Sequence, residues 1–183
     1  MRTFIVCLSL VIAVGCGSTS EAPNAHSASA AGGAAPASGG TQALAGTWTG
    51  RLTGQHDTAE DVTLKFSASG HLMYEYAVRD GGTRSVEWVS AGQKIEFLPP
   101  GGGVQRITIE AIENAANRVT ITQKWVFEQS GNFLTQNFLT SQVECTLTAD
   151  GLKVTIANVA ERFMNGNPTG TESETYVGVL KKQ

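Results

Sequence analysis

Residues 119–127 read VTITQKWVF, and the pattern of this stretch indicates the fold class. Val119, Ile121, Trp125 and Phe127 fall on one side of an extended chain, with polar residues between most of them. Side chains alternate between the two faces of a β-strand, so this pattern is typical of a strand with one buried face. The stretch therefore predicts an antiparallel strand whose apolar side is shielded from water.

The same alternation recurs along the chain on both sides of this stretch. The apolar positions that alternate with polar ones are Val62, Leu64 and Phe66; Leu72, Tyr74, Tyr76 and Val78; Val86 and Trp88; Ile95 and Phe97; Ile107 and Ile109; Val143, Cys145 and Leu147; and Leu152, Val154 and Ile156. Short turn sequences such as Asp80-Gly81-Gly82 and Asp150-Gly151 separate these runs, and a longer loop is expected at residues 165–173. Glycine tolerates the positive φ that tight hairpins require.

These runs predict an all-β domain of about eight to ten strands joined in order. An antiparallel up-and-down β-barrel is the simplest topology, because closing the sheet removes its exposed edges. A two-layer β-sandwich is the structural alternative.

Length and charge limit the classes of protein to consider. The chain has 183 residues, enough for one ordinary domain with appendages, and 41% of them are hydrophobic. Its formal net charge is −3. A protein that binds nucleic acid needs a basic face to neutralise phosphates, so the charge balance argues against that class.

The N-terminus has the features of an export signal. A basic residue, Arg2, precedes an apolar run at residues 4–14. A membrane-spanning helix needs about 20 apolar residues, so this run is too short to span and has the length of a signal-peptide core. We therefore assign residues 1–15 as a signal peptide.

Residues Ala13-Val14-Gly15-Cys16 resemble the lipobox of bacterial lipoproteins. The resemblance implies cleavage before Cys16, attachment of acyl chains such as palmitate to that residue, and lasting membrane residence. With Gly at position 17, it also implies an outer-membrane location in the cell envelope, facing the periplasm or the cell surface. The alternative is an ordinary secretory signal in which Cys16 is incidental.

Residues 16–42 form a segment of different composition. Residues 17–42 read GSTSEAPNAHSASAAGGAAPASGGTQ and contain no large apolar side chain. Such a segment cannot bury enough surface to offset its ordering entropy, so we expect a disordered tether. The folded domain then occupies residues 43–183.

The start of this domain resembles a lipocalin-like (calycin) barrel. Gly46 and Trp48 match the Gly-x-Trp of the first strand in that group, where the Trp plugs the closed end of the barrel. The resemblance implies a basic residue on the last strand that stacks over this Trp, and Lys181 is the residue that the sequence offers for that role.

Polar residues that interrupt apolar stripes are the candidates for a pocket, because a buried polar group needs a partner that a ligand can supply. Gln123 interrupts the stripe that runs from Val119 to Phe127. The complete candidate set is Tyr74, Tyr76, Trp88, Gln123, Trp125, Gln136 and Asn158. Alternatively, the aromatic residues are core and the amides bond to backbone at the mouth of the barrel.

The sequence offers little catalytic or metal-binding chemistry. No His-x-His or His-Glu-x-x-His pattern occurs, and the polar cluster of His56, Asp57, Glu60 and Asp61 matches no calcium loop. The only residues that suggest an enzyme are His71 and Glu75, which we expect to lie side by side on one face of a strand. We therefore predict a non-enzyme without a cofactor or metal.

The three cysteines have different expected fates. Cys7 leaves with the signal peptide and Cys16 carries lipid, so Cys145 has no partner for an intramolecular disulfide. Its place in an alternating strand predicts a small buried hydrophobe.

Taken together, the sequence predicts a lipid-anchored protein of the cell envelope. Its barrel would bind a small apolar or amphipathic molecule, and its partner would be the membrane, through Cys16. The alternative is a structural or interaction lipoprotein with a filled interior that acts in envelope assembly or maintenance.

Overall fold

The computed structural model describes residues 41–55, 58–129 and 134–183. A short 3-10 helix, η1 (Thr41–Leu44), precedes ten strands. The strands are β1 (Gly46–Gly54), β2 (Ala59–Phe66), β3 (Leu72–Ala77), β4 (Thr83–Glu87), β5 (Lys94–Phe97), β6 (Val104–Ala115), β7 (Arg118–Gln129), β8 (Thr135–Thr148), β9 (Gly151–Met164) and β10 (Asn167–Lys182). The predicted signal peptide, the lipidation site Cys16 and nearly all of the tether lie outside the described residues.

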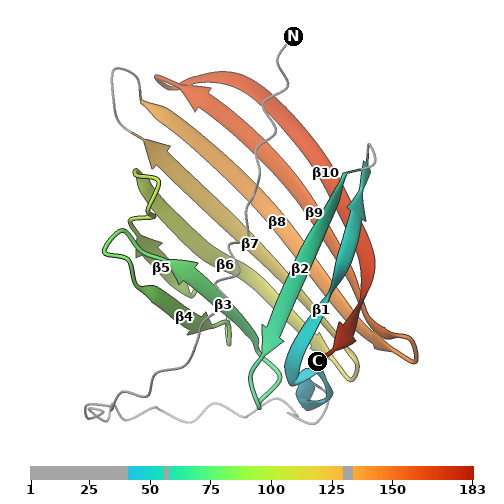
Figure 1. Cartoon of the computed structure of the whole chain (residues 1–183). Helices are drawn as coiled ribbons and strands as arrows, with labels where there is room; N and C mark the ends of the chain where they lie inside the picture. Colours follow the sequence, from blue (N-terminus) through green and yellow to red (C-terminus); the bar gives the residue numbers. More distant parts are fainter. Residues whose placement is uncertain (1–40, 56–57, 130–133) are drawn as a thin grey trace, which may run out of the picture.

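All ten strands belong to one antiparallel sheet in the order β4-β3-β2-β1-β10-β9-β8-β7-β6-β5. Each strand pairs with its neighbour in sequence, except that β4 and β5 share no ladder and β1 pairs with β10. Figure 1 shows the long strands β6 to β10 curving as one surface, with β1 and β2 turned in front of them. The prediction of an all-β, up-and-down fold is confirmed, and the sheet curls into a half-barrel.

The two ends of the sheet approach each other where β3 and the turn after it contact the end of β5. The backbone N–H of Arg79, just after β3, donates to the carbonyl of Leu98, just after β5, over 2.7 Å. The rings of Tyr76 and Phe97 lie 4.4 Å apart between centroids. These contacts draw the short strands together and define a concave inner face.

Apolar side chains fill the inner face at the end of the half-barrel where β1 begins. The buried set comprises Leu44, Trp48, Leu52, Val62, Phe66, Leu72, Val78, Trp88, Phe97, Ile107, Ile109, Val119, Ile121, Val143, Cys145, Leu152, Val154 and Leu180. Most of these are the residues whose alternation predicted the strands. Cys145 is 1% exposed, and burial raises the pKa of its thiol to about 12, so the prediction of a buried thiol is confirmed.

The expected loop at residues 165–173 is wrong. The chain turns within Asn165 and Gly166, whose φ angles are 50° and 79°, and β10 begins at Asn167. The polar segment is held as a strand by its pairing with β9, although the register shifts between Pro168 and Gly170. Turn-forming residues gave the wrong expectation because a long neighbouring strand supplies the backbone hydrogen bonds.

Candidate ligand-binding site

Trp48 is buried near the start of β1, at one end of the half-barrel. Its side chain is 4% exposed, and its Nε1–H donates to the carbonyl of Leu44 over 2.7 Å. Gly46 has a φ of 115°, and a Cβ there would lie 2.9 Å from Cε of Lys182. Glycine is favoured at this position by its backbone conformation, whereas the contact with Lys182 involves the far end of a flexible side chain that can move.

The basic residue over this tryptophan is Lys182, not Lys181. Nζ of Lys182 lies 5.5 Å from the centroid of the Trp48 ring. Trp48 and Lys182 are direct partners across β1 and β10, so they share the inner face, whereas Lys181 points outward and donates to the carbonyl of Asp150. The sequence prediction was wrong by one residue, and in a strand one residue reverses the face.

An aromatic cluster on the inner face brings together four of the predicted pocket residues. Tyr74 lies at its centre, with ring-centroid distances of 5.7 Å to Tyr76, 6.1 Å to Trp88 and 5.4 Å to Trp125. Trp88 is 1% exposed and belongs to the core. Burial and the neighbouring Tyr76 raise the pKa of Tyr74, which keeps its phenol neutral.

A polar row crosses the inner face beside this cluster. Gln123 on β7 pairs with Ser141 on β8, Ser141 pairs with Asn158 on β9, and Asn158 pairs with Glu174 on β10. Gln123 is 9% exposed and Ser141 is 4% exposed. Two predicted pocket residues, Gln123 and Asn158, thus lie in one row, next to the row that holds Trp125.

Two buried polar atoms in these rows have no hydrogen-bond partner among the described residues. They are the donor Nε1 of Trp125 and the acceptor Oδ1 of Asn158. A buried polar group without a partner costs about 1–3 kcal/mol relative to one that is bonded. Such atoms are rare in folded proteins, and an ordered water or a bound ligand is the usual partner of one that the protein leaves without a hydrogen bond.

Gln136 lies on the opposite, outer face of the sheet and is not part of this group. Its Nε2 donates to Oε1 of Glu128 over 2.9 Å. Glu128 also forms a 2.6 Å ion pair with Arg106, which in turn bonds Glu96 at 2.6 Å. This network ties β5, β6, β7 and β8 together on the outside.

A pair of carboxyl groups on the inner face was missed by sequence reasoning. Oγ1 of Thr58 donates to Oε1 of Glu174 over 2.7 Å. Burial, followed by the charge of Glu174, raises the pKa of Glu60. Burial also raises the pKa of Tyr176, which bonds to Glu174, to about 12. The signal for Glu60 was available, because it continues the period of Val62, Leu64 and Phe66.

His71 does not pair with Glu75, as the enzyme hypothesis required. Glu75 bonds Lys65 at 2.9 Å, whereas Nδ1 of His71 lies 3.0 Å from Oε1 of Glu87. Glu87 also accepts hydrogen bonds from Ser67 and Ser69. Because the serines bond to the carboxylate rather than to the imidazole, this arrangement lacks the nucleophile–base contact of a catalytic triad.

We expect Glu87→Gln to lower the free energy of unfolding at pH 7 by about 1 kcal/mol or less, since the group is partly exposed. The hydrogen bond from Ser67, with those from His71 and Ser69, lowers the pKa of Glu87. A lowered folded-state pKa gives stability above the unfolded pKa, which is lost as the pH falls through the folded pKa. Urea unfolding between pH 7 and pH 3 should therefore show a shallower pH dependence in the variant. An unchanged slope would contradict this role.

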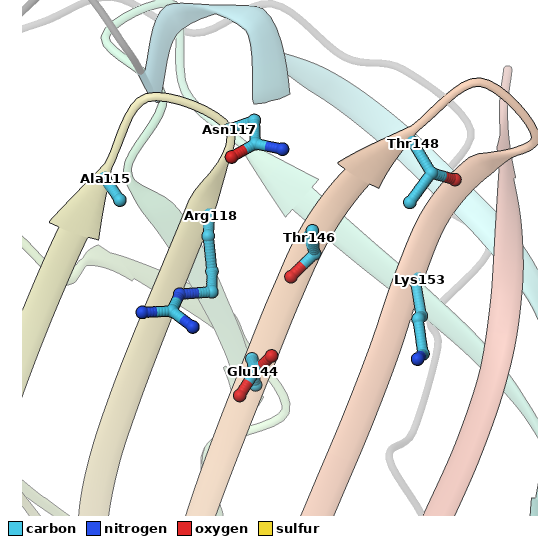
Figure 2. A pocket seen from close by; sticks show the side chains of 7 residues that line it. All are labelled: Ala115, Asn117, Arg118, Glu144, Thr146, Thr148 and Lys153. Carbon is cyan, nitrogen blue, oxygen red and sulfur yellow. The ribbon is translucent and has the colours of Figure 1, made fainter.

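A hollow of about 510 Å³ lies on the outer face, at the end where β6 turns into β7. Figure 2 shows Arg118, Glu144, Thr146 and Lys153 projecting from neighbouring strands around it. Their immediate neighbours in sequence, such as Val119 and Cys145, are buried, so these polar side chains point away from the core. This hollow is therefore separate from the inner-face residues.

Comparisons with protein-family models, curated proteins and solved structures found no match to this chain. Within the described ranges, no group of three or more His, Cys, Asp or Glu residues could hold a metal ion. In the same residues no helix has the length and apolar character needed to cross a membrane. The fold and the inner-face residues thus define an all-β half-barrel with a candidate binding surface.

Proposed function

We propose that this chain is a lipid-anchored protein of the cell envelope that binds a small apolar or amphipathic molecule on the concave face of its half-barrel. The lipobox resemblance at Cys16 supports the anchor, and the Ala/Gly/Ser-rich tether supports a domain held clear of the membrane. One observation carries the binding function: the buried, unpartnered Trp125 Nε1 and Asn158 Oδ1 lie on the same face as the aromatic cluster.

Binding would combine apolar burial with two oriented hydrogen bonds. β7 and β9 are separated by two strand spacings of about 4.8 Å each, so one small molecule can reach both Trp125 and Asn158. The ligand would accept from Trp125 Nε1–H and donate to Asn158 Oδ1. Its apolar body would lie against Tyr74 and Tyr76, with a gain of about 25 cal/mol per Å² of apolar surface buried.

Removing the two unpartnered atoms tests this function, because stability and binding should change in opposite directions. We expect Asn158→Leu, which keeps the size of the side chain, to leave the unfolding free energy unchanged or raise it by about 1–2 kcal/mol. Trp125→Phe removes the donor but keeps an aromatic ring. Each variant should bind the neutral fluorescent probe dansylamide, whose sulfonamide carries both acceptor oxygens and N–H donors, about tenfold more weakly, which corresponds to roughly 1.4 kcal/mol.

Gln136→Ala is the matched control, since this amide lies on the outer face and should leave probe affinity unchanged. Trp125→Ala and Gln123→Ala should lower the affinity for the probe further, while the far-UV circular dichroism spectrum stays that of a β-protein. Variants that lose stability yet keep the affinity of the native chain would show that the two atoms have partners within the protein.

The alternative function is a structural or interaction lipoprotein that acts in envelope assembly or maintenance. The observation that favours it is the dense packing of the inner face near the start of β1, where Leu152, Val154 and Leu180 are 0% exposed. The 510 Å³ hollow, in contrast, lies on the outer face of the sheet. A protein of this kind would bind no small molecule on its inner face, so the same probe titration separates the two functions.

A further inference from the structure

The carboxylate of Glu174 is held in place on the inner face by its surroundings. It accepts from Thr58 Oγ1 at 2.7 Å, and it lies over Gly54. A Cβ on Gly54 would come within 2.2 Å of Thr58 Oγ1 and 2.8 Å of Glu174 Oε1. The absence of a side chain at Gly54 therefore makes the space in which the carboxylate sits.

Among the residues that the structure describes, this corner of the inner face carries negative charge without a matching cation. Glu60 is close enough to Glu174 for their charges to repel. Neither carboxylate has an ion pair among the described residues, and the neighbouring Arg162 is bonded to Glu172 at 2.8 Å. Both carboxylates are partly buried, and a nearby positive charge stabilises the ionised form of such a group.

Asn158 provides a second and independent observation at the same place. It is the direct partner of Glu174 across β9 and β10, and its buried Oδ1 has no hydrogen-bond partner in the described part of the chain. The corner thus presents hydrogen-bond acceptors on three side chains, Asn158, Glu174 and Glu60. Among the described residues, no positively charged group donates to them. A protonated amine carries three N–H donors and one positive charge, which matches this set.

We propose that the molecule bound on the concave face is an amphipathic cation. Its ammonium group lies among Asn158, Glu174 and Glu60, a hydrogen-bond acceptor on its body lies at Trp125 Nε1, and its apolar part lies against Tyr74. This inference rests on the proposed function and narrows it to one chemical class of ligand.

Three probes with the same chain and different head groups test the inference. Calorimetric titration of the purified full-length protein, below the micelle concentration of each probe, would compare dodecylammonium, dodecanol and dodecanoate. We expect dodecylammonium to bind at least tenfold more tightly than dodecanol, and dodecanoate to bind most weakly. Glu174→Gln should lower the affinity for dodecylammonium about tenfold and change the affinity for dodecanol less than twofold.

Glu161→Gln is the matched control, because it removes the same charge from the outer side of β9 and should change no affinity more than twofold. Glu60→Gln provides a second test on another strand if Glu174→Gln folds poorly. Equal affinities for the three probes, tighter binding of dodecanoate, or an equal effect of Glu161→Gln would overturn the cationic class while the proposed binding function stands. Failure of all three probes to bind would overturn both.

Discussion

Trp48→Ala is expected to lower the free energy of unfolding by about 3–5 kcal/mol, the range for deleting a large buried aromatic side chain. The ring is 4% exposed and is covered by Lys182, and its Nε1 satisfies the carbonyl of Leu44. Alanine would leave a cavity at the base of the half-barrel and a carbonyl without its donor. Equilibrium urea unfolding, followed by far-UV circular dichroism, measures the loss.

Val179→Ala is the control for this prediction. Val179 lies on the outer side of β10 and is 43% exposed, so its truncation should change stability by less than about 0.5 kcal/mol. Similar losses of unfolding free energy for Trp48→Ala and Val179→Ala would show that burial of the Trp48 ring does not stabilise the core.

Gly178→Ala should lower the free energy of unfolding by about 1–3 kcal/mol, because the seam between the first and last strands has no room for a methyl group. A Cβ at Gly178 would lie 2.5 Å from the carbonyl oxygen of Arg51 and 2.8 Å from Cδ2 of Leu52. The first of these contacts is with backbone, so β1 and β10 would have to move apart.

Gly170→Ala is a matched substitution on the same strand. Nothing lies within 4 Å of the position of its Cβ, so the variant should be as stable as the native chain or slightly more stable. Thermal unfolding of the two variants side by side measures the difference. If Gly178→Ala unfolds at the same temperature as Gly170→Ala, the tight β1–β10 seam is not a constraint on the fold.

Period-two burial could be predicted from sequence because it is a local property. Val119, Ile121, Val143 and Cys145 alternate with polar residues, and all four are buried in the structure. The same alternation placed Gln123 on the inner face, where it lies in the polar row. Sequence reasoning thus predicted most of the strands and their up-and-down order, and it placed Gln123 on the same face as the apolar core.

Gln136 shows where this reasoning fails. The stripe of Leu134, Gln136 and Phe138 has the same period as the stripe of Val143 and Cys145, yet it lies on the other face of β8. At this end of β8 apolar side chains also occupy the outer face: Leu134 is 40% exposed, and Phe138 packs edge-on against Phe163 at 5.4 Å. Periodicity gives the spacing of a face but not which face is covered.

The carboxyl pair could not be found from local pattern alone. Glu60 and Glu174 are brought together only because β2 and β10 flank β1, a pairing between the two ends of the domain. The error at Lys181 has the same origin, since the register of β10 against β1 decides which lysine covers Trp48. Long-range register determined these parts of the site.

A crystal structure of the protein purified from its own cell envelope would test ligand binding on the concave face. We expect electron density for a small molecule within hydrogen-bond distance of both Trp125 Nε1 and Asn158 Oδ1, with its apolar part against Tyr74. Density in which both atoms bond only to protein groups or to ordered water, with side chains filling the remaining space, would contradict it.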